Sequence, residues 1–73
     1  MGQANTFPMR LQQLREKRQI SRSVLSELCG LSKNQIARYE RGERAPTANA
    51  LCALAEFFDV SVDYLLCLKD EKK

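Results

Sequence analysis

Signals that start and stop α-helices recur closely along this 73-residue chain, so every helix in it is expected to be short. A serine or threonine is a good N-cap, because its hydroxyl accepts a hydrogen bond from a backbone N–H in the first helical turn. Such residues precede four of the apolar runs, and they are Thr6, Ser21, Ser32 and Ser61. Gly30 and Gly42 stand where helices end, as glycine commonly does. The pattern predicts helices over about residues 7–18, 22–29, 33–41, 47–58 and 62–68.

The five helices are expected to form one all-α domain, a compact five-helix bundle. No segment alternates between apolar and polar residues as a strand would, and a chain of this length buries only a small core. The residues expected to face that core are Phe7, Leu11, Leu14, Leu25, Leu28, Leu51, Leu54, Ala55 and Phe58. Those expected to face solvent on the first helix are Arg10, Glu16, Lys17 and Arg18. Residues 7–68 would be the domain, residues 1–6 a flexible N-terminus and residues 69–73 a charged tail.

Charge is distributed unevenly along the chain. Residues 1–44 contain nine Lys and Arg against four Asp and Glu, a net charge of +5. Residues 45–73 contain three against five, a net charge of −2. This asymmetry favours a polyanionic partner for the first part of the chain only.

Several classes of function lack the residues that they need. There is no histidine, and the three cysteines, Cys29, Cys52 and Cys67, share no zinc-binding spacing, so neither a metal site, a disulfide framework nor a cofactor is expected. A cysteine without a neighbouring base is a poor nucleophile, and no paired carboxylates or phosphate-binding glycine loop are evident, so an enzyme is not expected. No apolar run is long enough to span a bilayer. A cytoplasmic protein with no membrane partner and no small-molecule ligand is expected.

The helix predicted over residues 33–41 has one strongly polar face. At about 100° per residue, Lys33, Asn34, Arg38 and Arg41 surround the small Ala37, while Ile36 and Tyr39 fall on the other side. Arg and Lys can donate to guanine O6 and N7, and Asn can pair with adenine N6 and N7 in the major groove. A solvated helix face is the alternative interpretation of this pattern. Tyr39 is expected in the core rather than stacked on a base.

A neighbouring helix strengthens the nucleic-acid interpretation. Two short, capped helices joined by a tight glycine turn over residues 21–40 form a helix-turn-helix unit. Arg22 begins the first of these helices, where the helix dipole also favours phosphate. Arg41 and Arg44 flank the glycine-containing loop after the second helix and form a candidate phosphate clamp.

The segment from Ile20 to Pro46, ISRSVLSELCGLSKNQIARYERGERAP, resembles the phage-repressor-like (Xre/Cro-type) helix-turn-helix family. The sequel LCALAEFFDVSVDYLL resembles the fourth and fifth helices of that family, and the resemblance extends from about Leu11 to Leu66. The most telling string has the pattern I-x-x-Y/I-E-x-G-x-x-x-P, supplied by Ile36, Tyr39, Glu40, Gly42 and Pro46. The resemblance implies a lambda-repressor-like DNA-binding domain.

The resemblance also implies roles for individual residues. Lys33, Asn34 and Arg38 would read base edges, and Gln35 and Arg22 would lie near phosphates at helix starts. Arg15 and Glu40 would form a structural ion pair that joins the first helix to the end of the third. Three residues depart from the family pattern, namely Arg22 in place of a frequent glutamine, Val24 in place of an acidic residue and Asp59 in place of a glycine.

The expected function is that of a transcriptional regulator, a repressor that binds double-stranded DNA as a homodimer on an inverted-repeat operator. Phe57, Tyr64 and Cys67 are a candidate dimer surface, and packing of Phe57 within the monomer is the alternative. A protein-only role, as an antitoxin-like or adaptor module that binds a protein through the same fold, is the alternative function. A bacterial or phage origin follows from the resemblance alone.

Overall fold

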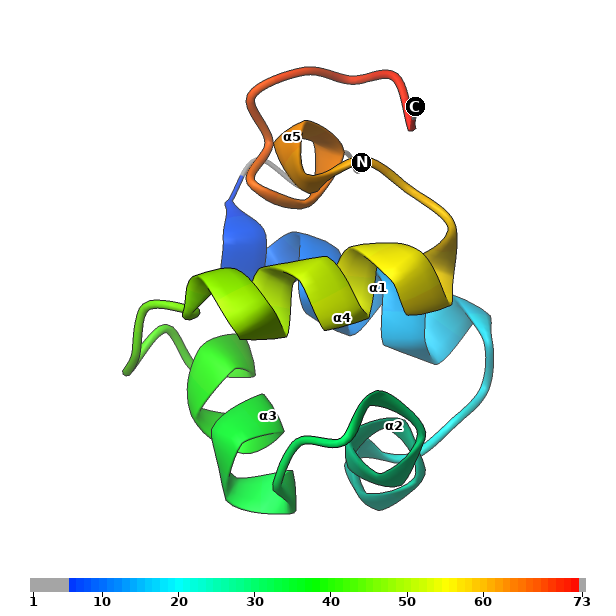
Figure 1. Cartoon of the computed structure of the whole chain (residues 1–73), viewed down its shortest axis with the longest axis vertical. Helices are drawn as coiled ribbons and strands as arrows, with labels where there is room; N and C mark the ends of the chain where they lie inside the picture. Colours follow the sequence, from blue (N-terminus) through cyan, green and yellow to red (C-terminus); the bar gives the residue numbers. More distant parts are fainter. Residues whose placement is uncertain (1–5, 73) are drawn as a thin grey trace.

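The computed structural model describes residues 6–72, which contain five α-helices and no β-strand (Figure 1). The helices are α1 (Phe7–Lys17), α2 (Arg22–Cys29), α3 (Lys33–Glu40), α4 (Ala48–Phe58) and α5 (Val62–Leu65). The all-α fold predicted from the sequence is confirmed. The flexible N-terminus expected over residues 1–6 lies outside the described residues except for Thr6, and Lys73 of the expected tail lies outside them as well.

A serine or threonine hydroxyl caps the start of every helix. The Ser21 hydroxyl accepts from the backbone N–H of Val24 at 3.1 Å, and the Ser61 hydroxyl accepts from that of Tyr64 at 3.0 Å. Thr47 is the N-cap of α4 rather than its first residue, so that helix begins one residue later than predicted. Local hydrogen bonding thus explains why the sequence located all five helix starts to within one residue.

A residue in the left-handed backbone conformation stands at or just after the end of each of the five helices, with Gln19 at φ 58° after α1 and Gly42 at φ 74° after α3. Gly30 has φ 70° after α2, and Asp59 has φ 57° after α4, where it takes the conformation for which glycine is more usual. Cys67 has φ 62° shortly after α5. This turn, with the backbone N–H of Leu68 donating to the carbonyl of Asp63, ends α5 at Leu65 rather than at the predicted residue 68.

Gly30→Ala should lower the free energy of unfolding by about 1–2 kcal/mol, the cost of a left-handed conformation for a residue with a Cβ. No heavy atom lies within 4 Å of the position that the added Cβ would occupy, so steric overlap contributes nothing. Urea denaturation followed by circular dichroism measures the change. Gly30→Asn is the matched control and should lose less, because asparagine tolerates this conformation. Equal losses in the two variants would contradict this explanation.

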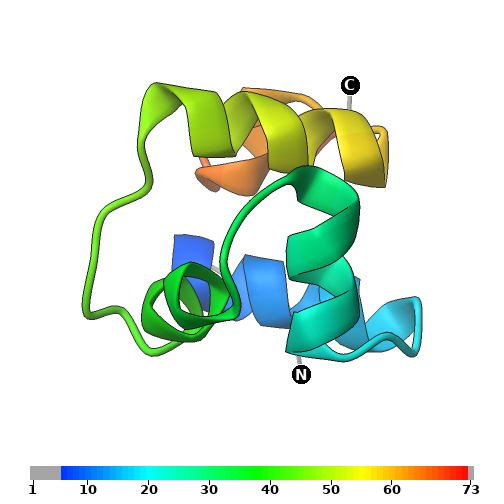
Figure 2. The same cartoon turned by 60° about the horizontal axis from the view of Figure 1, so that its bottom comes forward.

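The helices are arranged around one core in three tiers. In Figure 1, α4 crosses in front of α1, α5 lies on one side of them, and α2 and α3 lie on the other. α3 contacts both α1 and α2, while α4 contacts α2 and α5. Figure 2 shows α3 nearly end-on while α2 runs lengthwise, joined by the short turn after Gly30. This is the geometry of a helix-turn-helix that projects from a helical base.

The core is formed by apolar residues from all five helices. Its largest fully buried side chains are Leu11, Leu25, Ile36, Tyr39, Leu54 and Leu65. The ring of Tyr39 meets that of Phe7 edge-on, with centroids 5.9 Å apart. The prediction that Tyr39 belongs to the core is confirmed, and α3 is consequently anchored to α1 by one of its faces.

Two predictions about which side chains are buried and which are exposed were wrong. Leu28 was expected in the core, but it is 59% exposed at the end of α2. Arg10 was expected in solvent, but only 3% of it is exposed. Its guanidinium stacks on the ring of Tyr64, 3.9 Å from the centroid, and its Nη1 donates to the Tyr64 carbonyl at 2.8 Å. Arg10 therefore joins α1 to α5, because an aromatic face and a carbonyl compensate its desolvation.

The chain after α5 returns to the body of the protein. The backbone N–H of Ser61 donates to the carbonyl of Lys72, which brings the tail beside the start of α5. Within residues 6–72 no helix is both long enough and apolar enough to cross a bilayer.

Candidate nucleic-acid interface

The start of α3 is fixed by a reciprocal pair of hydrogen bonds between Ser32 and Gln35. The Ser32 hydroxyl accepts from the Gln35 backbone N–H, and the Gln35 Oε1 accepts from the Ser32 backbone N–H, both at 3.0 Å. This is a capping box, in which the side chains of the N-cap residue and of the third helical residue each bond the other's backbone N–H. Gln35 Nε2 also donates to the Tyr39 hydroxyl at 3.3 Å. The side chain of Gln35 thus fixes the first turn of α3. These contacts use only one of the two N–H donors on its Nε2.

The three residues predicted to read base edges lie on the exposed face of α3. Lys33, Asn34 and Arg38 are exposed, and Ala37 between them is half-buried. The opposite face of the helix carries Ile36 into the core. Among residues 6–72, no hydrogen bond or ion pair engages the side chains of Lys33, Asn34 or Arg38. The arrangement presents two cations and an amide to an external partner.

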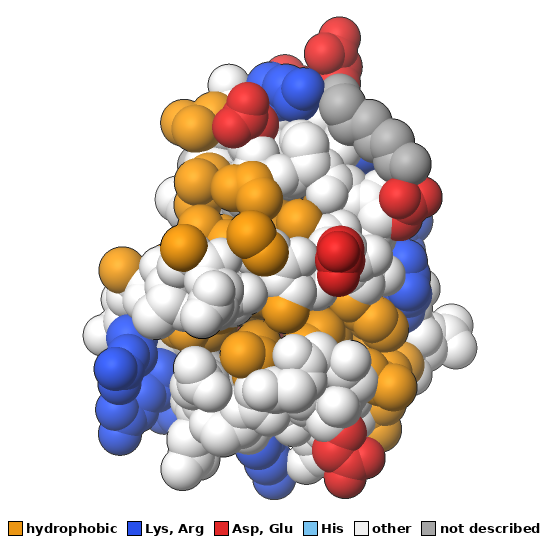
Figure 3. Space-filling model, viewed as in Figure 1, with side chains coloured by type: hydrophobic (Ala, Val, Ile, Leu, Met, Phe, Trp, Pro, Cys, Tyr) orange, Lys and Arg blue, Asp and Glu red, His pale blue; other side chains and the backbone are white. Residues whose placement is uncertain are grey.

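Arg41 and Arg44 lie in and beside the loop that follows α3, and both are exposed. Arg41 Nε donates to the Ala37 carbonyl at 3.4 Å, and its Nη1 lies 3.8 Å from a carboxylate oxygen of Glu43. The side chains of Arg41 and Glu43 are 59% and 52% exposed, so this pair contributes little to stability and leaves the arginine open to other anions. Figure 3 shows Lys and Arg side chains gathered beside this loop.

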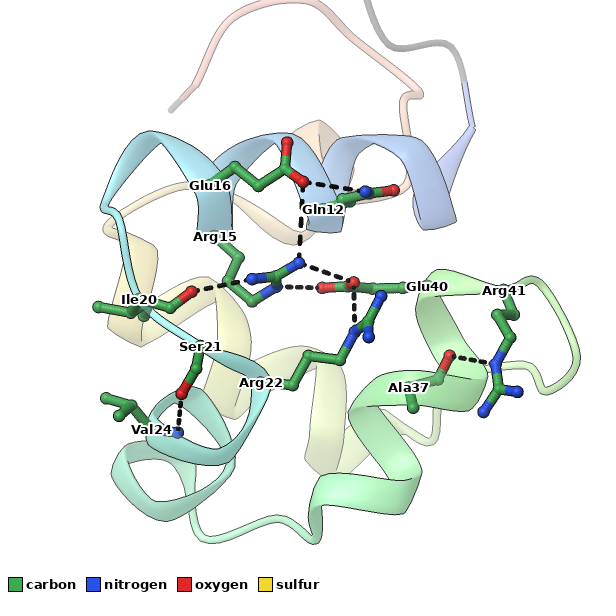
Figure 4. A network of polar contacts seen from close by, with 10 residues as sticks. All are labelled: Gln12, Arg15, Glu16, Ile20, Ser21, Arg22, Val24, Ala37, Glu40 and Arg41. Carbon is green, nitrogen blue, oxygen red and sulfur yellow. Dashed lines mark hydrogen bonds and ion pairs between the residues drawn. The ribbon is translucent and has the colours of Figure 1, made fainter.

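A buried carboxylate joins the three helices behind this surface. The Glu40 side chain has no exposed area, and it meets Arg15 from α1 and Arg22 from α2 (Figure 4). Arg15 Nε donates to Glu40 Oε2 at 2.6 Å and Arg15 Nη2 donates to Oε1 at 3.2 Å. Arg15 Nη1 donates to the Ile20 carbonyl at 2.9 Å. The hydrogen bond to Glu40 raises the pKa of Arg15, against the opposing effect of burial.

The structure brings Arg15 and Glu40 together as the family resemblance implied, and it adds a contact that the sequence did not indicate. Arg22 Nε donates to Glu40 Oε1 at 2.9 Å, while its side chain is 42% exposed. The two residues are 18 positions apart, and the resemblance suggested only that an amide is usual where Arg22 stands. No local signal connects Arg22 to Glu40, because the contact depends on how α2 packs against α3.

The candidate dimer surface is not assembled as predicted. Tyr64 is buried beneath Arg10, so its expected place on that surface was wrong. Phe57 and Cys67 are each half-buried. The Phe57 ring packs edge-on against Phe58 with centroids 5.0 Å apart. Part of the Phe57 side chain is therefore packed within the monomer, in agreement with the alternative interpretation.

Other apolar side chains are exposed instead. Val24 is 42% exposed and Leu28 59% exposed, one turn apart on α2. Leu28 lines a shallow hollow with Cys29, Ala53 and Phe57. Figure 3 shows hydrophobic side chains at the surface beside α4, with acidic side chains near them.

None of the three cysteines, all of which lie within the described residues, forms a disulfide. Cys52 is exposed, whereas Cys29 and Cys67 are half-buried. Burial raises the pKa of the Cys29 thiol, which disfavours the nucleophilic thiolate. In the described part of the chain, no group of three or more potential ligands is placed to hold a metal ion.

A family model described as "Helix-turn-helix" matches residues 11–65. The uncharacterized HTH-type transcriptional regulator YobD of Bacillus subtilis (strain 168) is 39% identical over 65 residues, which cover 89% of this chain and 58% of that protein. The HTH-type transcriptional regulator AnsR of the same strain is 39% identical over 64 residues, which cover 88% of this chain and 55% of AnsR. The chain thus spans little more than half the length of these relatives.

Solved structures are similar over nearly all of the compared chains. The P22 c2 repressor protein in complex with synthetic operator 9T superposes with a TM-score of 0.81 and 32% identity, over 86% of this chain and 96% of that chain. The N-terminal DNA binding domain of SinR from Bacillus subtilis has a TM-score of 0.78 and 28% identity, over 85% and 91%. The likeness therefore extends well beyond the two helices of the helix-turn-helix.

Proposed function

Because the chain belongs to the phage-repressor-like (Xre/Cro-type) helix-turn-helix family, we propose that it binds double-stranded DNA sequence-specifically as a transcriptional regulator. We further propose that it acts as a repressor, as a homodimer on an inverted-repeat operator in the cytoplasm. The observation that carries the proposal is the exposed face of α3, where Lys33, Asn34 and Arg38 lie opposite a buried apolar face.

The major groove is wide enough to admit α3 with this face leading. Arg38 and Lys33 would donate to guanine O6 and N7, and Asn34 would pair with adenine N6 and N7. The small side chain of Ala37 allows the helix axis to approach the base edges. The capping box at Ser32 fixes the direction in which the first turn of α3 points.

The surrounding polar residues are suited to hold the DNA backbone. Arg22 at the start of α2, Gln35 at the start of α3, and Arg41 and Arg44 in the following loop would contact phosphates. Such contacts set the register of a protein on DNA without reading its sequence. They also make the affinity fall as salt is raised, because phosphate contacts release condensed cations.

One α3 reads few base pairs, so two copies are needed for a specific site. A two-fold dimer places its recognition helices about one turn of DNA apart, and its operator is then an inverted repeat. The structure of the P22 c2 repressor protein with a synthetic operator supports DNA binding by a chain of this fold. Protection of a single half-site would contradict the dimeric form of the proposal.

Arg38→Ala should weaken binding to the preferred duplex by about 1–3 kcal/mol and relax the preference at one or two base positions, because a bidentate base contact is lost. Arg44→Ala should weaken binding to preferred and random duplexes alike. It should also make the fall of log affinity with log salt less steep, by about 0.9. Fluorescence anisotropy with both duplexes, between about 0.05 and 0.2 M salt, measures these effects. If the two variants behave identically on both duplexes, the division into base readers and backbone contacts is wrong.

A protein-binding role is favoured by one observation, the exposed stripe of Val24 and Leu28 on α2. An antitoxin-like or adaptor module would use such a surface to bind a protein. The double variant Val24→Ser, Leu28→Ser discriminates the two functions. DNA binding through α3 should survive it, whereas binding of a protein partner through α2 should not.

A further inference from the structure

Glu40 makes one contact more than a structural ion pair between α1 and α3 requires, because it bonds Arg22 as well as Arg15. Its Oε1 accepts hydrogen bonds from two arginines, Arg15 Nη2 at 3.2 Å and Arg22 Nε at 2.9 Å. Its Oε2 accepts from Arg15 Nε at 2.6 Å. The bidentate contact with Arg15 would by itself join α1 to the end of α3.

The charges in this cluster do not cancel. One carboxylate is shared by two guanidinium groups, and Arg15 is the more enclosed partner, with 11% of its side chain exposed against 42% for Arg22. Glu16 lies 3.9 Å from Arg15 but is 60% exposed, so water screens its charge. A positive charge therefore remains, and it is located on the exposed member, Arg22.

The geometry of the contact leaves most of the Arg22 guanidinium unused by Glu40. A guanidinium has five N–H donors, and the bond to Glu40 uses only the Nε–H. The Nη groups lie farther along the side chain than the atom that is held. Arg22 is also the first residue of α2, where the helix dipole adds partial positive charge.

We propose that Glu40 is a positioning residue for DNA-backbone binding, in that it holds Arg22 by Nε and so directs the two Nη groups at a phosphate. This inference rests on the proposed DNA binding. The bond restricts the rotamers of Arg22 before DNA arrives, so less conformational entropy is lost on binding. The carboxylate that fastens α1 to α3 thereby also sets the direction of a DNA contact on α2.

Arg22→Lys and Arg22→Gln separate position from charge without disturbing the bond between Arg15 and Glu40. Arg22→Gln should weaken binding to the preferred duplex about tenfold, the contribution of one charged hydrogen bond. It should also reduce the steepness with which log affinity falls with log salt (the salt slope) by about 0.9. Arg22→Lys keeps the charge but has no Nε–H or planar fork. It should retain most of the salt slope yet bind nearly as weakly as Arg22→Gln. Wild-type affinity in Arg22→Lys would overturn the proposal.

A double-mutant cycle tests Glu40 itself. Glu40→Gln should weaken binding severalfold when residue 22 is arginine and by nothing further when it is glutamine, after correction for the folded fraction measured by circular dichroism. An equal loss in both backgrounds, or no loss in either, would show that Glu40 is structural only. If Glu40→Gln does not fold, the result with Arg22→Lys decides. Failure of the wild type to prefer any duplex would instead refute the proposed function, and this inference with it.

Discussion

Arg15→Ala should lower the free energy of unfolding by about 3–5 kcal/mol, the usual cost of breaking a buried ion pair from one side. The substitution leaves the fully buried Glu40 carboxylate with Arg22 alone and removes both hydrogen bonds between α1 and Glu40. It also deprives the Ile20 carbonyl of its donor. Small domains are stable by only about 5–15 kcal/mol, so folding should fail before DNA recognition is affected. Urea denaturation at neutral pH measures the loss.

Glu16→Gln provides the matched control, because Glu16 is the other carboxylate beside Arg15. Its oxygen lies 3.9 Å from Arg15 Nη2, and its side chain is 60% exposed. Exposed pairs contribute between zero and about 1 kcal/mol. A loss in Glu16→Gln as large as that in Arg15→Ala would contradict the assignment of Glu40 as the stabilising partner.

Leu25→Ala should destabilise the protein by about 2–5 kcal/mol, because it opens a cavity where α2 packs on the core. The Leu25 side chain is fully buried, and α2 contacts both α3 and α4. A cavity at this place would weaken the packing of α2 against α3 and α4. Thermal and urea denaturation should both show the loss.

Leu28→Ala is the same change one turn later on the same helix. With Leu28 59% exposed, it should alter the free energy of unfolding by less than about 0.5 kcal/mol. Equal effects at the two positions would mean that Leu28 packs in the core, as helical spacing predicts, and would contradict its exposed place on α2.

The contrast between Leu25 and Leu28 shows where a periodic pattern stops being informative. Residues three apart on a helix differ by about 60° around its axis, so both fit a broad apolar stripe. The buried residues of α2 are Leu25 and Ser26, about 100° apart around the axis, and Leu28 falls on the side of Leu25 away from Ser26. How wide the contact is depends on the neighbouring helices, and no pattern within residues 22–29 records it.

Local features were predictable for a physical reason. Helix starts depend on hydrogen bonds within four residues, as at Ser32 and Gln35, so the sequence alone located them. The polar face of α3 follows from helical periodicity once its buried face is known. The side chains of Lys33, Asn34 and Arg38 accordingly lie together on the exposed side.

Contacts between distant residues were predicted poorly. Arg10 and Tyr64 are 54 positions apart, and nothing near Arg10 distinguishes it from a solvated arginine. The same holds for Arg22 and Glu40, 18 positions apart. The pair of Arg15 with Glu40 was implied only by family resemblance. A buried charge is identified by its partners, and those are set by tertiary packing.

Selection of bound duplexes from a random DNA pool, at about 0.15 M salt and again at higher salt, tests the central claim that α3 reads base sequence. The wild type should enrich an inverted repeat with a fixed spacer. Asn34→Ala, selected in parallel, should lose the preference at one base position in each half-site while keeping the remainder. Weak binding that is abolished by salt, with no enriched sequence, would contradict the claim and would direct attention to a protein partner for this domain.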